Sequence, residues 1–137
     1  MYRFETTIRV RYAETDKMGF VYYGNYAAYY EVGRVEALRS LGVTYKSMEE
    51  TGVMLPVLEN YSKYILPAQY DDLLTLAVIL KEKPTSRIRF DYEIYNHEKK
   101  LINLGYTTLV FIDMKTGRPA EAPAYIHEIL NPFFDGH

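Results

Sequence analysis

The sequence predicts an α+β fold: a five-stranded, mostly antiparallel sheet wrapped around one long central helix. Three observations support this. A strand pattern opens the chain, one long helical pattern follows it, and further strand patterns fill residues 53–112. Only the helix is long enough to cover a sheet, so a sheet wrapped around it is the natural packing. This packing leaves one sheet face and the edge strands exposed, so we expect copies of the chain to associate.

The first strand is expected at residues 2–12, where apolar and charged residues alternate. The long helix follows, because apolar or small residues recur with a helical period over residues 26–41. Asn25 is a suitable N-cap for this helix, and Gly42 is a suitable stop. Gly33, inside the helix, costs about 1 kcal/mol relative to alanine. We expect it to allow close approach to the sheet.

Charged residues on this helix are spaced for pairing at its surface. Glu31 and Arg34 lie three positions apart, and so do Glu36 and Arg39. Side chains with this spacing are neighbours on a helix. We therefore expect two ion pairs on its exposed side.

The second half of the chain is predicted to be mostly strands. Residues 53–65 are extended, with Pro56 marking an edge or a bend. Gly105 indicates a bulge or a close contact. The remaining elements are expected as strands at residues 73–82, 87–95 and 101–112, a turn at 113–117, a short helix at 44–50, and a short helix or irregular tail at 123–130.

The composition places the whole chain, residues 1–137, in one domain. A net charge of −2 argues against a general nucleic-acid binder, and the absence of cysteine excludes disulfides and thiol catalysis. The N-terminus does not resemble a signal peptide, and the longest apolar run, residues 73–80, is too short to span a membrane. We therefore expect a cytoplasmic protein. The spacing of His97, His127 and His137 supports no metal site.

The segment between the first strand and the long helix carries the candidate chemistry. Asp16 lies in a turn, and the elbow Tyr23-Gly24-Asn25 opens the helix. The first N–H groups of a helix lack internal partners and carry the positive end of its dipole. A carboxylate beside such donors can attack an activated acyl group or activate water, while the donors stabilise the oxyanion. Asp16 as a mere turn or cap residue is the alternative.

These residues resemble the 4-hydroxybenzoyl-CoA thioesterase family of hotdog-fold proteins, which includes the short acyl-CoA thioesterases associated with Tol–Pal operons. The matching segments are Asp16-Lys-Met-Gly-Phe-Val-Tyr-Tyr-Gly-Asn-Tyr26 and Tyr30-Glu-Val-Gly-Arg34. The resemblance implies a catalytic role for Asp16, and for the Tyr23 backbone N–H at the thioester carbonyl. It also implies a homodimer or homotetramer with sites at a subunit interface.

Four further residues are predicted to bind substrate. Gly24 lets a substrate approach the backbone closely, and Asn25 adjoins it. In relatives, the region of Ser86 and Arg87 meets the phosphates or pantetheine of CoA, although a solvated strand face with ion pairs is the alternative. Some branches carry a histidine near the position of Tyr23, and this chain has none there. Phe20 replaces the usual aliphatic residue, which would reshape the acyl pocket.

The predicted function is hydrolysis of an acyl-CoA to acid and CoA, without a metal or other cofactor. Asp16 would act as nucleophile or as general base, and the sequence leaves both routes open. Two alternatives keep the fold: a thioesterase acting on an acyl-carrier protein, and a non-catalytic domain that binds acyl-CoA. A hotdog dehydratase is less well supported, because its histidine partner is missing from the expected loop.

Overall fold

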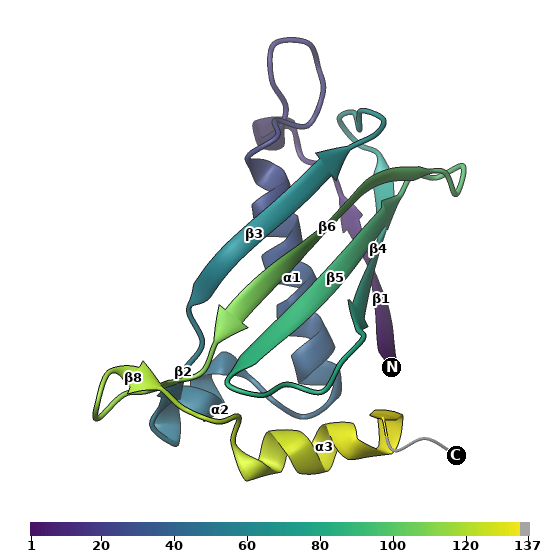
Figure 1. Cartoon of the computed structure of the whole chain (residues 1–137). Coiled ribbons are helices and arrows are strands. Elements are labelled where there is room, and N and C mark those ends of the chain that lie inside the picture. Colours follow the sequence, from purple (N-terminus) through teal and green to yellow (C-terminus); the bar gives the residue numbers. More distant parts are fainter. Residues whose placement is uncertain (135–137) are drawn as a thin grey trace.

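The computed structural model describes residues 1–134 and contains a five-stranded antiparallel sheet packed on the long helix α1 (Asn25–Ser40). Figure 1 shows the sheet curving across one side of α1. The strand order is β1-β4-β5-β6-β3, so β1 and β3 are the edges. The predicted fold class is therefore confirmed. The strands are β1 (Tyr2–Arg9), β3 (Val57–Tyr64), β4 (Leu73–Leu80), β5 (Arg87–Tyr95) and β6 (Leu101–Val110).

Smaller elements close the ends of this layer. Helices α2 and α3 lie at the lower end in Figure 1, and the loop that precedes α1 lies at the upper end. A second, three-stranded sheet has the order β2-β7-β8 and was not predicted. No helix within residues 1–134 is long and apolar enough to cross a bilayer. The bounds are η1 (Tyr12–Glu14), α2 (Tyr45–Glu50), β2 (Val53–Met54), β7 (Ile112–Asp113), β8 (Arg118–Pro119) and α3 (Ala124–Phe134).

Several predicted boundaries need correction. The first strand ends at Arg9 rather than at residue 12, because the chain turns into η1. The predicted extended segment 53–65 is two strands, which separate at Pro56 and join different sheets. Pro56 indicated an edge strand or a bend. The strand that follows it, β3, is indeed an edge of the five-stranded sheet. The C-terminal helix α3 runs to Phe134, beyond the predicted residue 130.

The start of α1 also differs from the prediction. Gly24 is the N-cap and Asn25 is the first helical residue, so the assignment of Asn25 as the cap was wrong by one position. The Asn25 side chain instead donates from Nδ2 to the carbonyl oxygen of Glu14 at 2.9 Å. This bond fastens the helix to η1. At the other end Gly42 has φ +87°, a left-handed conformation, and confirms the predicted stop.

One of the two predicted surface ion pairs is wrong. Glu36 and Arg39 do form a salt bridge on the surface of α1. Arg34, by contrast, is only 6% exposed and donates from Nε to the hydroxyl of Tyr45 at 3.0 Å. It makes no ion pair with Glu31 or with any other carboxylate of the described residues. The helical spacing predicted that Glu31 and Arg34 were neighbours, but not that Arg34 faces the core.

Glycine allows the closest contact between α1 and the sheet. A Cβ atom at Gly33 would lie 2.5 Å from Leu76 Cδ2 and 2.9 Å from Val78 Cγ2, both on β4. Real Cβ contacts are never this short, so only glycine lets α1 approach β4 at this point. The role predicted for Gly33 is confirmed.

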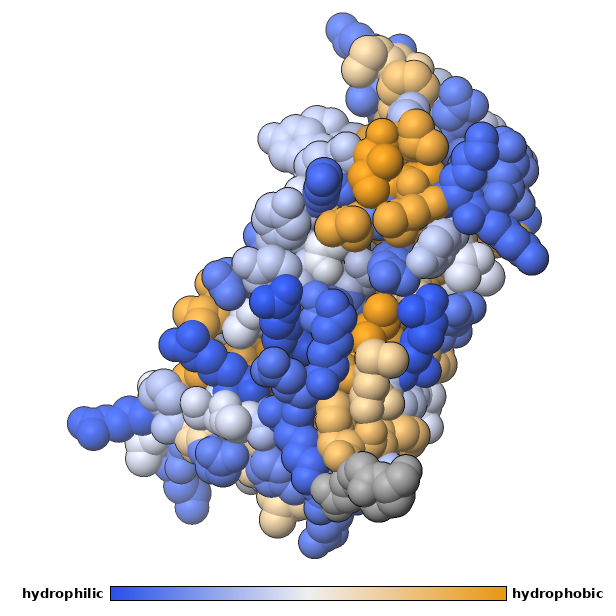
Figure 2. Space-filling model, turned by 45° about the vertical axis from the view of Figure 1, so that its right-hand side comes forward, coloured by the Kyte–Doolittle hydropathy of each residue, from blue (hydrophilic) through white to orange (hydrophobic). Residues whose placement is uncertain are grey.

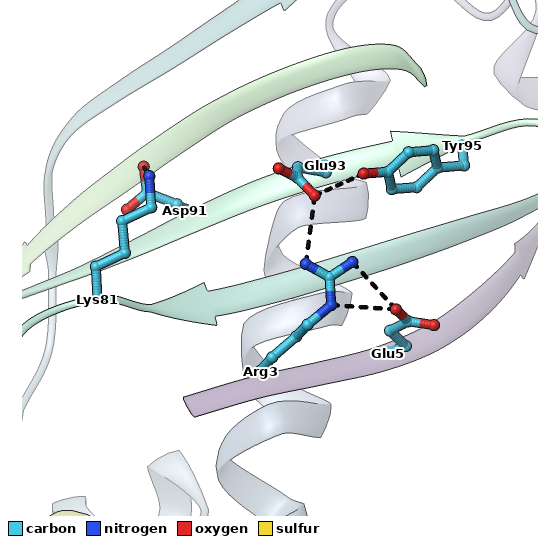
Figure 3. Close-up of polar contacts among 6 residues, drawn as sticks. All are labelled: Arg3, Glu5, Lys81, Asp91, Glu93 and Tyr95. Carbon is cyan, nitrogen blue, oxygen red and sulfur yellow. Dashed lines mark hydrogen bonds and ion pairs between the residues drawn. The ribbon is translucent and has the colours of Figure 1, made fainter. Parts of the chain in front are cut away.

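The outer face of the sheet carries charged residues on β1 and β5. Arg3 pairs with Glu5 at 3.1 Å and with Glu93 at 3.3 Å, and the Tyr95 hydroxyl donates to Glu93 at 2.7 Å (Figure 3). Exposed pairs of this kind contribute roughly 0–1 kcal/mol each. Figure 2 shows that hydrophilic residues on the surface border an apolar area in its upper half.

Candidate active site

A surface cavity of about 480 Å³ lies at the N-terminal end of α1. Its walls come from the loop before α1, from the first helical turn, and from the segment that links β3 to β4. The sequence did not predict the contribution of that last segment. The lining residues are Asp16, Phe20, Val21, Tyr22, Tyr23, Tyr26, Tyr64, Ile65, Leu66 and Pro67.

The loop itself holds the carboxylate of Asp16 in place. One oxygen, Oδ1, accepts the backbone N–H groups of Met18 at 2.9 Å and Phe20 at 3.2 Å. Gly19 closes the turn with φ +80° and donates its N–H to the carbonyl of Asp16 at 3.0 Å. Within residues 1–134, Oδ2 makes no hydrogen bond. The half-buried side chain therefore has one fixed oxygen and one oxygen available for chemistry.

Backbone N–H donors lie at the helix start beside this carboxylate. The Asn25 N–H donates to the backbone carbonyl of Tyr22 at 2.9 Å, and the Tyr26 N–H donates to the backbone carbonyl of Tyr23 at 3.2 Å, as expected in a first helical turn. The N–H groups of Tyr23 and Gly24 have no acceptor in the part of the chain that the structure describes. Tyr23 lines the cavity, and N–H groups at a helix start carry the positive end of the helix dipole.

Tyrosines form much of the remaining cavity wall. The rings of Tyr26 and Tyr64 meet edge to face with centroids 5.4 Å apart, and Tyr23 lies 6.4 Å from Tyr64. Tyr22 and Tyr23 contact one another at 4.7 Å. Burial raises the pKa of Tyr26 to about 12, so its hydroxyl stays protonated at neutral pH. Apart from Asp16, the cavity is therefore lined by aromatic and aliphatic side chains.

A second carboxylate near the motif, Glu14, has a structural role. It accepts the backbone N–H of Arg11 and the hydroxyl of Tyr29, each at 2.9 Å, and forms an ion pair with the Arg11 guanidinium. Partial burial raises the pKa of Glu14, but these hydrogen bonds outweigh burial and lower it overall. Glu14 therefore stays ionised and ties η1 to α1.

The other predicted substrate-binding residues are not at this cavity in a single chain. Gly24 adjoins it without lining it, and the Asn25 side chain points to Glu14 instead. Ser86 and Arg87 lie at the start of β5, at the opposite end of the sheet from the loop that carries Asp16 (Figure 1).

Arg87 lines a separate groove of about 390 Å³ on the outer side of the sheet. There Asp91 pairs with Arg89 at 3.1 Å and with Lys81 at 3.8 Å, the pair drawn in Figure 3. Arg87 forms no ion pair with any residue in 1–134. The groove carries more cations than anions, which suits phosphate groups. Its lining residues are Lys81, Glu82, Lys83, Thr85, Arg87, Arg89 and Asp91.

The described residues contain no group of three or more His, Asp or Glu side chains suited to hold a metal ion. His97 forms a pair with Glu98 at 3.8 Å, and His127 with Glu121 at 3.4 Å. His137 lies outside the described residues.

Comparison with known proteins agrees with this geometry. The profile of the thioesterase-like superfamily matches residues 10–130. The chain is 32% identical over 114 residues to the putative acyl-CoA thioesterase YneP of Bacillus subtilis, which covers 83% of both chains. It is 29% identical over 123 residues to the acyl-CoA thioester hydrolase YbgC of Escherichia coli O6:H1, which covers 90% of this chain and 92% of the relative. The DHNA-CoA thioesterase of Staphylococcus aureus superposes with a TM-score of 0.84 at 32% identity, which covers 98% of this chain and 85% of that chain.

The fold and the cavity define a hotdog-fold protein with an acidic group at the start of its central helix. The matched profile spans most of the chain, so the chain belongs to the thioesterase-like superfamily. The resemblance stated from the Asp16–Tyr26 motif is thereby confirmed at the level of the family.

Proposed function

We propose that the protein hydrolyses acyl-CoA thioesters, with Asp16 as the catalytic carboxylate. The observation that supports this most directly is the shared cavity. It is lined by Asp16, whose Oδ2 makes no hydrogen bond within residues 1–134, and by Tyr23, whose backbone N–H has no acceptor in the described chain. The names of the relatives, which include acyl-CoA thioesterases, favour the same substrate class.

Two routes use this geometry. In the first, Asp16 Oδ2 attacks the thioester carbon, CoA leaves as the thiolate, and water then hydrolyses the mixed anhydride. In the second, Asp16 takes a proton from water, the resulting hydroxide attacks the carbon, and CoA leaves in the same way. In both routes the Tyr23 N–H stabilises the negative charge that develops on the carbonyl oxygen. The products are the free acid and CoA.

A single turnover in ¹⁸O-labelled water tests for the anhydride route. Hydrolysis of an anhydride at its Asp16 carbonyl leaves the label in the Asp16 carboxylate, which mass spectrometry of the peptide containing residues 12–23 detects. Label in Asp16 therefore excludes direct attack by water, whereas label only in the free acid fits both direct attack and hydrolysis of the anhydride at the substrate carbonyl.

We expect the purified protein to hydrolyse at least one member of a panel of aromatic and aliphatic acyl-CoA esters. Release of free thiol measures the rate. Lys17 and Lys63 are exposed and adjoin the lining residues Asp16 and Tyr64 in sequence, and exposed lysines near a site would suit an acidic acyl-carrier protein as an alternative donor. Parallel assays with acyl-carrier substrates decide between the two donors. Tight acyl-CoA binding without hydrolysis of any thioester would refute the proposed activity.

We further propose that the chain forms a dimer through the edge strand β3. Nearly every residue of β3 is exposed, including Val57, Leu58, Tyr61 and Tyr64, each 46–51% exposed. An exposed apolar edge strand is a template for pairing with another strand. A second copy pairing antiparallel would continue the sheet and cover these side chains.

The sequence of β3 favours one register for such a pair. Residues directly opposite one another in an antiparallel pair have their side chains on the same face of the sheet. In a symmetric pair, the twofold axis must therefore lie between the two copies of one residue, which face each other. An axis at Tyr61 places Glu59 opposite Lys63 of the second copy, and the reverse. It therefore forms two cross-strand ion pairs, each worth roughly 0.2–1 kcal/mol.

This register also brings the two predicted parts of the site together. In β6, Val110 pairs with Arg87 and its neighbour Leu109 pairs with Val57, so Arg87 lies about level with residue 56. The axis at Tyr61 sets residue 56 of the second copy opposite Leu66, which lines the Asp16 cavity. Three strand spacings, about 14 Å, then separate the second copy's Arg87 from β3. The pantetheine arm of CoA would span this gap, with its phosphates at Ser86 and Arg87.

Reversing one charge in β3 is expected to weaken the dimer. Lys63→Glu sets two glutamates opposite one another at both ends of the proposed pairing, and the dissociation constant should rise about tenfold. The double variant Glu59→Lys, Lys63→Glu restores opposite charges and should recover the wild-type constant. Sedimentation velocity over a concentration series measures both.

The matched control is Lys99→Glu, the same charge reversal at an exposed residue of the β5–β6 turn, away from β3. It should leave the dimer unchanged. Equal weakening by both single variants, or no recovery in the double variant, would contradict the register at Tyr61.

A further inference from the structure

Arg34 is a buried cation without a counter-charge. It is only 6% exposed, on the face of α1 that packs against β5 and β6. Its Nε donates to the Tyr45 hydroxyl at 3.0 Å, and the Tyr92 hydroxyl lies next to the guanidinium. No carboxylate of residues 1–134 lies within ion-pair distance. A buried charge is costly unless it is paired, so this guanidinium needs an explanation.

The groups next to Arg34 are uncharged tyrosine hydroxyls. The hydroxyl of Tyr92, a residue 1% exposed, finds no hydrogen-bond partner in the described structure. Burial raises the pKa of Tyr92 to about 12 and also raises that of Tyr45, so both hydroxyls keep their protons. Thr107 also adjoins Tyr92, but its own hydroxyl donates to Asn60 at 2.7 Å.

Counting these groups shows an excess of donors. A guanidinium has five N–H groups and accepts nothing, and the hydroxyl oxygens of Tyr45 and Tyr92 can accept two of the five. The protons of the Tyr45 and Tyr92 hydroxyls have no acceptor among the described residues either. Buried donors are normally satisfied, by a bound ion where the protein offers no acceptor. A single small anion would accept from several of these donors and balance the charge of Arg34.

We propose that Arg34, Tyr45 and Tyr92 form a binding site for a small monovalent anion, of the size of a halide or formate. Tyr45 also lines a surface cavity of about 240 Å³ between α2 and the β2–β3 link, together with Glu49. The bound ion would join α1 to α2 and β5. It would therefore stabilise the fold without taking part in thioester chemistry.

Thermal unfolding of the whole protein tests this site, with sodium bromide compared with sodium gluconate at equal ionic strength. Gluconate is too large for the buried cluster. In wild type, bromide at tenfold excess over its dissociation constant should raise Tm by about 3–6 °C relative to gluconate. A crystal grown in bromide should show anomalous density within hydrogen-bond distance of the Arg34 guanidinium.

Two variants and a control complete the test. Arg34→Met should abolish the bromide effect. Tyr92→Phe, which removes only the hydroxyl, should reduce it even if Arg34→Met fails to fold. Arg39→Met removes an exposed arginine from the same helix and should keep the full effect. Equal Tm values in the two salts, or a carboxylate of a second copy seated on Arg34 in the crystal, would overturn the proposal.

Discussion

Replacing Asp16 with asparagine is expected to lower kcat for thioester hydrolysis by about 10³-fold while leaving the fold intact. The side-chain oxygen of asparagine can still accept the N–H groups of Met18 and Phe20, so the turn keeps its geometry. The substitution removes only the charge and basicity of the second oxygen. Release of free thiol from the best substrate of the acyl-CoA panel measures the effect, and thermal unfolding shows whether the fold is preserved.

Asp113→Asn is a closely matched control for this variant. Asp113 also accepts a backbone N–H two residues further on, from Lys115 at 2.8 Å, in the turn between β7 and β8. Asp113 lines none of the cavities described above, so replacing its carboxylate with an amide should leave kcat unchanged. Activity of Asp16→Asn above one tenth of wild type would mean that the carboxylate is not the catalytic group. An equal loss in both variants would point to stability instead.

The local part of the site was predictable from the sequence. Asp16 and Tyr23 lie only seven positions apart, and one turn followed by one helix start is enough to bring them together. Their positions in a common cavity agree with that expectation. Tyr64 and Leu66 were missed because they reach the cavity through sheet pairing. An exposed apolar run just after an edge strand is the signal that could have pointed to them.

Interactions across the fold were less accessible from sequence. The spacing of Glu31 and Arg34 fits a surface ion pair, and nothing local shows that Tyr45 and Tyr92 surround Arg34 instead. The position of Arg87 relative to Asp16 depends in the same way on strand order and, in the proposed dimer, on a second copy of the chain. Hydrophobic periodicity and turn residues indicate where helices and strands lie in the sequence. They do not indicate which helices and strands pack together.

For Gly105, too, the sequence indicated a special position but not its contacts across the sheet. Its sequence position allowed either a bulge or a close contact. The register of β6 is regular at Gly105 on both sides, facing Ser62 in β3 and Tyr92 in β5. The contact explanation is therefore the correct one. The Tyr30 hydroxyl fills the space over Gly105 and hydrogen-bonds to Ser62 at 2.9 Å.

Gly105→Ala is therefore expected to destabilise the protein by about 2–3 kcal/mol, or roughly 100-fold in the folding equilibrium. A Cβ at this position would overlap the backbone oxygen of Tyr61 and would lie 2.5 Å from Tyr30 Oη. The ring of Tyr30 is fully buried and stacked on Tyr92 at 4.1 Å, so it cannot move aside. Relief requires β3 to separate from β6, which would also displace Tyr64 in the cavity wall. Urea unfolding measures the change.

Gly117→Ala provides the comparison for this loss. Gly117 has φ +70° in the open β7–β8 turn, and a Cβ there would meet no atom within 4 Å. Its cost is conformational strain alone, about 1 kcal/mol. A clearly larger loss at Gly105, with a fall in thioesterase activity before global unfolding, would tie the β3–β6 contact to the cavity. Equal losses in the two variants would mean that the sheet accommodates a methyl group here, against the close packing inferred.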